Sequence, residues 1–315
     1  MGIMKRIAYE LHRYIAKVKA CSYSLNFLTE SVPPGNFYSV IPSLSDLNKR
    51  GYAIFSKSVY VHSIGMHTEK QVQILKEFRE MSVPLFHLLE GTNRFNIGND
   101  TFSYDDAPVL HYMMRRLRPK RIIEIGSGNS SACMLDTSEN YLDDSVEFTF
   151  IDVNCDNLRK ILLPKDLDRV RILEQQVQDI DLNLFKTLQA NDILFVDSSH
   201  VCKIGSDLHT IFFEVLPILA RGVFIHFHDI RYPFQYSEGM VTKGIFWNEA
   251  YLLRAFLMNN NDFDIAFWLN YLVNVDLLEV KELVSFLPLS DWSRRFNNSS
   301  ADFSEAGGSI YITKK

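Results

Sequence analysis

The chain has 315 residues, with 33 Lys and Arg against 38 Asp and Glu, which gives a formal net charge of −5. Hydrophobic residues make up 47% of the chain and charged residues 23%, a composition that excludes a disordered chain and a fibrous repeat. The mild acidity excludes nucleic acid as the expected partner, because a protein that binds duplex nucleic acid needs a strong basic excess. Aromatic residues are 13% of the chain, and this excess indicates an apolar or ring-shaped ligand.

The cysteines show no CxxC spacing, so they indicate neither a disulfide framework nor a thiolate metal site. No run of about 18 apolar residues is present, and the first 20 residues lack the apolar core of a signal peptide. We therefore expect a cytoplasmic protein. The four cysteines are Cys21, Cys133, Cys155 and Cys202.

Residues 1–20 have apolar side chains at helical spacing, together with five basic side chains and one acidic side chain. Such a basic amphipathic helix either makes peripheral contact with an anionic membrane or packs on its own domain with a solvated basic face. Both interpretations stay open at the level of sequence.

The next part of the chain predicts helices over Thr68–Met81 and residues 104–118, with a break at Pro33–Gly35. We therefore expect a mainly helical N-terminal extension over residues 1–100 and a second domain over residues 101–315. No internal repeat or low-complexity tract interrupts either part.

From Arg121 onward, short apolar runs alternate with helical stretches, the pattern of parallel strands that crossover helices bury on both faces. This alternation predicts an α/β fold with a doubly wound, Rossmann-like sheet. Two later runs, Ile265–Leu269 and Ser309–Thr313, are further strand candidates. The five earlier runs are Arg121–Ile125, Glu147–Ile151, Val170–Leu173, Asp192–Val196 and Gly222–Phe227.

A glycine turn follows the first predicted strand and opens a helix, at the crevice where such sheets bind nucleotides. Ser131 occupies the position of the third glycine of a dinucleotide-binding turn, and Glu124 lies two residues before Gly126. A carboxylate there repels a pyrophosphate but suits the sulfonium and ammonium groups of S-adenosylmethionine. The turn therefore predicts an S-adenosylmethionine site that includes Glu124, Gly126, Ser127, Gly128 and Ser130.

Asp152 ends the second predicted strand, where its carboxylate is placed to accept hydrogen bonds from ribose hydroxyls. Val177 and Gln178 follow the third strand, and their position alone places them near the adenine.

Residues 120–253 resemble class I S-adenosylmethionine-dependent methyltransferases, in particular the group related to macrocin and macrolide-sugar O-methyltransferases. The resemblance is carried by PKRIIEIGSGNSS (119–131), NDILFVDSSH (191–200) and GVFIHFHDIRYPF (222–234), and it extends to FSYDDA (102–107), FWNEAYLLRAFL (246–257) and GGSIYITKK (307–315). It implies five parallel strands followed by an antiparallel C-terminal pair. Relatives of this group often accompany bacterial polysaccharide genes, so the resemblance also implies a saccharide or glycoconjugate acceptor.

The resemblance further implies an acceptor site at the ends of the fourth and fifth strands. It assigns Asp197, His228 and Asp229 to a divalent cation, and His200 to the general base that works with Asp197. His228 replaces an acid of the relatives, which disfavours Mg²⁺ and favours Mn, Fe or Zn. Catalysis by histidine without a cation is the alternative.

The sequence thus predicts an O-methyltransferase that acts on a glycan or small-molecule acceptor. A nicotinamide-dependent oxidoreductase on the same fold and a non-catalytic S-adenosylmethionine-binding scaffold are the alternatives. The sequence does not determine the oligomeric state, although a homo-oligomer is compatible with it.

Overall fold

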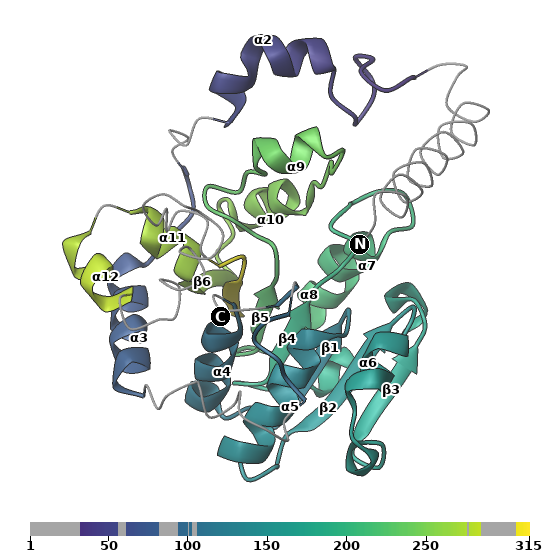
Figure 1. The fold of residues 1–315 in the computed structure, drawn as a ribbon, viewed down its shortest axis with the longest axis vertical. Coiled ribbons are helices and arrows are strands. Elements are labelled where there is room, and N and C mark those ends of the chain that lie inside the picture. Colours follow the sequence, from purple (N-terminus) through teal and green to yellow (C-terminus); the bar gives the residue numbers. More distant parts are fainter. Residues whose placement is uncertain are drawn as a thin grey trace, which may run out of the picture. The chain divides into compact units, whose positions relative to one another are not determined.

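The computed structural model describes residues 32–55, 61–81, 94–99, 101–102, 106–275, 277–284 and 307–315 (Figure 1). The basic helix predicted over residues 1–20 lies outside the described residues. Contacts divide the chain into two units, one of residues 1–57 with 237–246 and one of residues 58–236 with 247–315. The first unit contains α2 (Leu44–Phe55) and α9 (Glu238–Thr242). All other elements described below belong to the second unit.

A seven-stranded sheet forms the centre of the second unit, in the order β3-β2-β1-β4-β5-β7-β6 (Figure 1). The first five strands pair in parallel, whereas β7 is antiparallel to both β5 and β6. This arrangement confirms the predicted class I methyltransferase topology, and it differs from the dinucleotide-binding order 3-2-1-4-5-6. The strands are β1 (Arg121–Ile125), β2 (Glu147–Asp152), β3 (Val170–Glu174), β4 (Ile193–Val196), β5 (Phe224–Phe227), β6 (Phe263–Trp268) and β7 (Ile310–Lys314).

Helices cover both faces of this sheet, because right-handed crossovers on either side of β1 place them on opposite faces. On one face α4 (Asp106–Leu117), α5 (Asn129–Tyr141) and α6 (Asp156–Ile161) pack side by side (Figure 1). On the other face, α7 (Asp207–Thr210) continues through a π-helical stretch over Ile211–Val215 into α8 (Leu216–Ile218). Short 3₁₀ turns occupy Pro164–Asp166, Val177–Asp179 and Phe185–Thr187.

The remaining described helices follow β5 or precede α4. The predicted helix Thr68–Met81 is observed as α3 (Thr68–Glu80), which contacts β6, α11 (Leu269–Asn274) and α12 (Leu278–Leu283). Thus α3 belongs to the sheet unit, and the observed division of the chain does not follow the boundary predicted at residue 100. The other helix is α10 (Glu249–Leu257).

The core is built from the strands and from many of the aromatic side chains. All four residues of β4 are fully buried. Phe234, in the connection after β5, is 1% exposed and packs on Trp268 of β6. Tyr232 packs on the same tryptophan. The aromatic residues of this connection therefore serve largely as core, and Phe37, in the first unit, is 92% exposed.

Arg94 forms a buried ion network that ties the segment before α4 to the sheet unit. Its guanidinium donates to Asp136 of α5 at 2.7 Å and to Asp166 at 2.6 Å, and all three side chains are buried. Removal of the arginine would leave two uncompensated carboxylates, so the network fixes this segment against α5.

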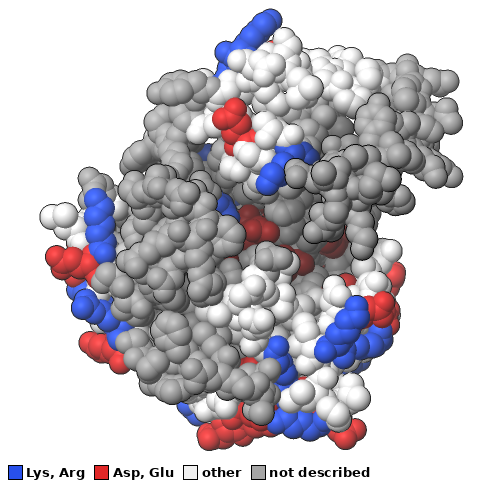
Figure 2. Space-filling view, in the orientation of Figure 1, with Lys and Arg blue, Asp and Glu red and all other residues white. Residues whose placement is uncertain are grey.

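Charged side chains of both signs are interspersed over the face of the molecule drawn in Figure 2. Exposed ion pairs include Arg159–Glu174 and Arg121–Glu147. Within the described part of the chain, no helix combines the length and the apolar character that a membrane span requires.

Candidate active site

The turn after β1 requires glycine at residue 126. Gly126 has a φ of +83°, and a Cβ atom there would lie 1.9 Å from the carbonyl oxygen of Asp197. The turn thus lies directly against the end of β4, and this contact brings the ends of β1 and β4 together. Neither the strained φ nor the close approach tolerates a side chain.

Glu124 lies beneath this turn and does not line either cavity described below. Its side chain is fully buried and accepts hydrogen bonds from the hydroxyls of Ser130 and Ser131. Burial raises the pKa of Glu124 to about 8, although the two hydroxyls oppose the shift. In the structure this carboxylate holds the turn from below, and the contact with the cofactor that the sequence predicts stays a prediction.

A cavity of about 460 Å³ opens at the ends of β1, β2 and β4. Asp152 lines it, and Oδ2 of this carboxylate accepts hydrogen bonds from the backbone N–H and hydroxyl of Ser127. Val177 and Gln178 line the same cavity, and their contact with the adenine stays a prediction. Val153, which is 68% exposed, adds an apolar wall that the sequence reading did not identify.

A second cavity, of about 520 Å³, lies over the start of α5. Its lining includes Ser127, Gly128 and Ser130 of the turn and Lys160 of α6. Asp197 lines both cavities. The glycine turn and Asp197 are therefore the features shared by the two hollows.

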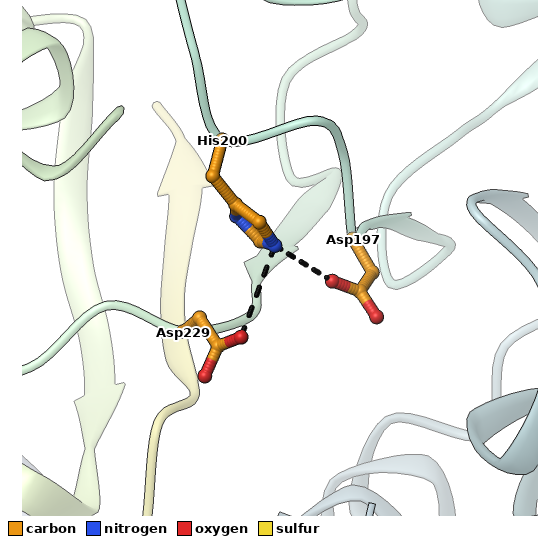
Figure 3. Close-up of side chains that lie close together, drawn as sticks. All are labelled: Asp197, His200 and Asp229. Atoms are coloured by element: carbon orange, nitrogen blue, oxygen red, sulfur yellow. Dashed lines mark ion pairs between the residues drawn. The ribbon is translucent and has the colours of Figure 1, made fainter. Parts of the chain in front are cut away.

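Two aspartates and two histidines meet at the ends of β4 and β5, and we name Asp197, His200, His228 and Asp229 the histidine–aspartate cluster. Figure 3 shows His200 between the two carboxylates. Nε2 of His200 lies 3.3 Å from Oδ1 of Asp197 and 3.8 Å from Oδ2 of Asp229. Nδ1 of His228 lies 3.6 Å and 3.7 Å from the same two oxygens.

His200 is held from outside the cluster by the start of α10. Its Nδ1 donates to Oε2 of Glu249 at 2.6 Å, and Glu249 is buried. The backbone oxygen of His200 accepts hydrogen bonds from the N–H groups of Asn248 and Glu249. The ring of Trp247 packs on the imidazole with ring centroids 4.0 Å apart. These contacts fix both the position and the plane of the ring.

His228 is held in a corresponding way by the start of α4. Its Nε2 lies 3.4 Å from Oδ2 of Asp106, which is also buried. The other carboxylate oxygen of Asp106 accepts hydrogen bonds from Gly308 N at 2.9 Å and Ser309 Oγ at 2.6 Å. The segment that leads into β7 thus holds Asp106 against His228.

The backbone of the cluster is strained at two positions. His200 has a φ of 59° and Asp229 a φ of 58°, the left-handed region that residues other than glycine rarely adopt. Such strain persists only where surrounding contacts enforce it, and it concentrates at functional sites.

The charged side chains of the cluster strongly shift one another's pKa values. Burial disfavours the charged form of His200, but Asp197 and Glu249 outweigh it and raise the pKa of this ring to about 10. Asp106 and Asp197 likewise outweigh burial and raise the pKa of His228 well above its usual range. The two imidazolium partners hold the pKa of Asp197 below its usual range against burial. The resemblance implies that His200 is a general base, whereas this ring keeps its proton at neutral pH.

The structure brings together every residue predicted for the acceptor site, and it adds three that the sequence reading missed. Glu249, Asp106 and Trp247 lie in or beside segments that carry the family resemblance, but no residue type or spacing assigned them a role. His226 is fully buried, and neither ring nitrogen has a hydrogen-bond partner among the described residues.

Comparison with known proteins identifies a family for part of this chain and one relative. Residues 123–230 match the family described as Methyltransferase domain. An uncharacterized protein of Archaeoglobus fulgidus is 32% identical over 199 residues, which cover 58% of this chain and 87% of that protein.

Two solved structures illustrate more distant similarity. The Podospora anserina methyltransferase PaMTH1, with bound S-adenosylhomocysteine, is 17% identical, with 88% of this chain and 99% of that chain covered and a TM-score of 0.39. The O-methyltransferase TomG of Streptomyces achromogenes is 12% identical, with 86% and 95% covered and a TM-score of 0.33.

The sheet order, the glycine turn and the domain match define an S-adenosylmethionine-dependent methyltransferase of class I. The chain belongs to the methyltransferase domain family, and it is related to the protein of Archaeoglobus fulgidus.

Proposed function

We propose that this methyltransferase transfers the methyl group to a hydroxyl of a saccharide or glycoconjugate acceptor. The observation that carries the proposal is the place of Asp197, which lines both cavities and belongs to the histidine–aspartate cluster. A group that activates a hydroxyl thus lies at the wall of the cofactor cavity.

The cofactor supplies a sulfonium methyl group, and this chain's residues provide its binding and orientation. Asp152 is placed to hold ribose hydroxyls, and Val153 and Val177 provide apolar walls for the base. Ser127 and Gly128 lie on the second cavity, where they are placed to hold the amino-acid end. Because attack on the methyl carbon must be in line, this positioning contributes much of the rate.

A hydroxyl is a poor nucleophile at neutral pH, so the acceptor has to lose its proton. Asp197 and Asp229 can each accept a hydrogen bond from one of two neighbouring hydroxyls, as in a vicinal diol. The mix of carboxylate and imidazole donors also fits a divalent cation, which would lower the pKa of a bound hydroxyl. Without a cation, His200 could accept the proton of the hydroxyl only in its neutral form, because the imidazolium that Asp197 and Glu249 favour has no free lone pair.

A saccharide is the acceptor class that suits this cluster best. Two carboxylates beside two rings present hydrogen-bond acceptors at short range, which matches adjacent hydroxyls rather than a single phenol or amine. Trp247, half-buried and packed on His200, offers an aromatic face beside the cluster for the apolar side of a sugar ring.

Methyl transfer from labelled S-adenosylmethionine to a panel of glycosides with and without vicinal diols tests the proposal. We expect transfer to diol-containing glycosides only, and a loss of about 10²-fold or more in Asp229→Asn. Binding of S-adenosylhomocysteine should be unchanged in this variant, and the exposed control Asp181→Asn should behave as wild type. Equal transfer to acceptors without a diol, or full activity of Asp229→Asn, would contradict the proposal.

A further inference from the structure

Four large apolar side chains of the first unit are exposed within eight consecutive residues. The rings of the first two, Phe37 and Tyr38, contact each other edge to face with centroids 5.1 Å apart. Single exposed apolar side chains are common on protein surfaces, whereas a group of them in one place marks an interaction site. Among the described residues, no other stretch of this length holds more than two large exposed apolar side chains. The four are Phe37, Tyr38, Val40 and Leu44, with exposed fractions of 92%, 79%, 87% and 71%.

These side chains belong to a closed loop, residues 35–44, which we name the aromatic loop and which runs into α2 (Figure 1). The backbone N–H of Gly35 donates to the carbonyl oxygen of Ile41 at 3.1 Å and closes the loop. Within it, Oδ1 of Asn36 accepts from the N–H of Tyr38, and Oγ of Ser39 accepts from the N–H of Ile41. The loop thus meets part of its own need for backbone hydrogen bonds, which lowers the cost of leaving water.

Charge is distributed unevenly between the aromatic loop and the sequence around it. Residues 31–45 contain no charged side chain, and the exposed side chains of Lys49 and Arg50 follow in α2. The first unit has nine Lys and Arg against four Asp and Glu, a formal charge of +5, whereas the whole chain carries −5. Such an asymmetry between parts of one chain indicates that the basic part binds an anionic surface.

An anionic phospholipid bilayer is the partner that fits both features. Phe and Tyr side chains favour the headgroup region of a bilayer, and basic side chains nearby are attracted to anionic headgroups. A nucleic acid would match the positive charge but would leave Val40 and Leu44 without an apolar partner. A second copy of this chain fits less well, because two basic units repel each other. The four side chains also present only on the order of 600 Å², less than the roughly 800 Å² that each partner buries in a stable interface.

We propose that the aromatic loop binds the first unit to an anionic phospholipid surface, with Phe37 and Tyr38 inserted among the headgroups. Lys49 and Arg50 supply electrostatic attraction beside the loop. The binding is peripheral, since the loop is too short to cross a bilayer. This surface differs from the basic helix predicted over residues 1–20. It goes beyond the proposed function, because none of its residues lines either cavity of the candidate active site.

Co-sedimentation of the full-length protein with lipid vesicles tests this surface. One set of vesicles mixes phosphatidylglycerol with phosphatidylcholine, and the other contains phosphatidylcholine alone. We expect binding to the mixed vesicles that is about tenfold or more tighter than binding to the neutral ones and that weakens as salt is added. Equal binding to both sets, or no binding to the mixed vesicles, overturns the proposal.

Paired variants separate the aromatic loop from other basic or apolar parts of the chain. The double variant Phe37→Ala/Tyr38→Ala should bind the mixed vesicles about tenfold or more weakly, and Lys49→Gln/Arg50→Gln should lose about tenfold on the mixed vesicles only. The matched control Phe213→Ala removes an aromatic ring of the second unit that is 58% exposed, and it should change nothing. Unchanged circular dichroism and S-adenosylhomocysteine binding verify that the variants fold. Undiminished binding by the double aromatic variant places the contact elsewhere and refutes the proposal.

A tryptophan exchange reports insertion directly. Phe37→Trp should show a blue shift of its fluorescence on the mixed vesicles and quenching by brominated lipid, beyond the signal of wild type, whereas Phe213→Trp should show neither. An unshifted spectrum of vesicle-bound Phe37→Trp means that the loop stays in water, and the proposal then fails. Light scattering without lipid addresses the second copy: a dimer that Phe37→Ala/Tyr38→Ala dissociates assigns the loop to self-association and likewise overturns lipid binding.

Discussion

Glu124 makes the stability of this protein depend on pH in an unusual direction. Its carboxyl group is fully buried beneath the glycine turn, and its pKa is raised from 4.5 to about 8. Below pH 4.5 the group is neutral in both the folded and the unfolded state, so it contributes no pH dependence. Between pH 4.5 and about pH 8, Glu124 is ionised in the unfolded chain but keeps its proton in the folded protein. The free energy of unfolding therefore falls as the pH rises through this window.

The size of this effect on stability follows from the pKa shift of Glu124. One pKa unit corresponds to about 1.4 kcal/mol, so the change from 4.5 to about 8 lowers the stability by about 5 kcal/mol well above both values. Between pH 5 and pH 8 the loss amounts to about 3 kcal/mol. Glu124→Gln removes the ionisation and keeps the shape of the protonated acid, with its amide still able to bond to Ser130 and Ser131.

Urea unfolding of wild type and Glu124→Gln at pH 5, 6, 7 and 8 measures this contribution. The variant should gain about 3 kcal/mol relative to wild type over that range, because every other titrating group is common to both proteins. Glu147→Gln, an exposed carboxylate on the neighbouring strand β2, should show no such gain. A difference between Glu124→Gln and wild type that stays constant within about 1 kcal/mol from pH 5 to pH 8 would refute the reasoning.

Three further predictions concern the turn and the core. Gly126→Ala should weaken S-adenosylhomocysteine binding more than tenfold by calorimetry, about 1.4 kcal/mol or more, because its Cβ would clash with the backbone of Asp197. Gly244→Ala, at a position with a φ of +79° and open space around its Cβ, should lose less, and equal losses would rule out the clash. Arg94→Met should lower the free energy of unfolding in urea by about 3 to 5 kcal/mol, because two buried carboxylates lose their partner; a loss below about 1 kcal/mol would show that water reaches them. His226→Phe should raise the unfolding free energy by about 1 to 3 kcal/mol, since it removes two buried nitrogens without partners, and a destabilised variant would show that these nitrogens have partners in solution.

Much of the fold was predictable because buried parallel strands leave a direct signature in sequence. The run at Ile193–Val196 is apolar throughout because helices cover both of its faces, and the glycine turn follows from a position that excludes any side chain. These local features placed Asp197 and Asp229 at strand ends, and the family's strand order made them neighbours. Asp152, Val177 and Gln178 line the cavity at the ends of β1, β2 and β4 for the same reason.

The tertiary structure alone decided how those residues are held. Glu249 and Asp106 reach the two histidines from 49 and 122 residues away, and no periodicity or spacing encodes a contact between such distant segments. The tertiary structure also decided the direction of the Glu124 side chain. At the end of β1 its carboxylate could have faced the cavity or turned beneath the glycine turn. The hydroxyls of Ser130 and Ser131 hold it beneath the turn. Sequence by itself thus determined the sheet and the position of its functional edge, because both follow from local patterns of burial. Packing decided which atoms face one another there, because that depends on segments brought together only when the chain folds.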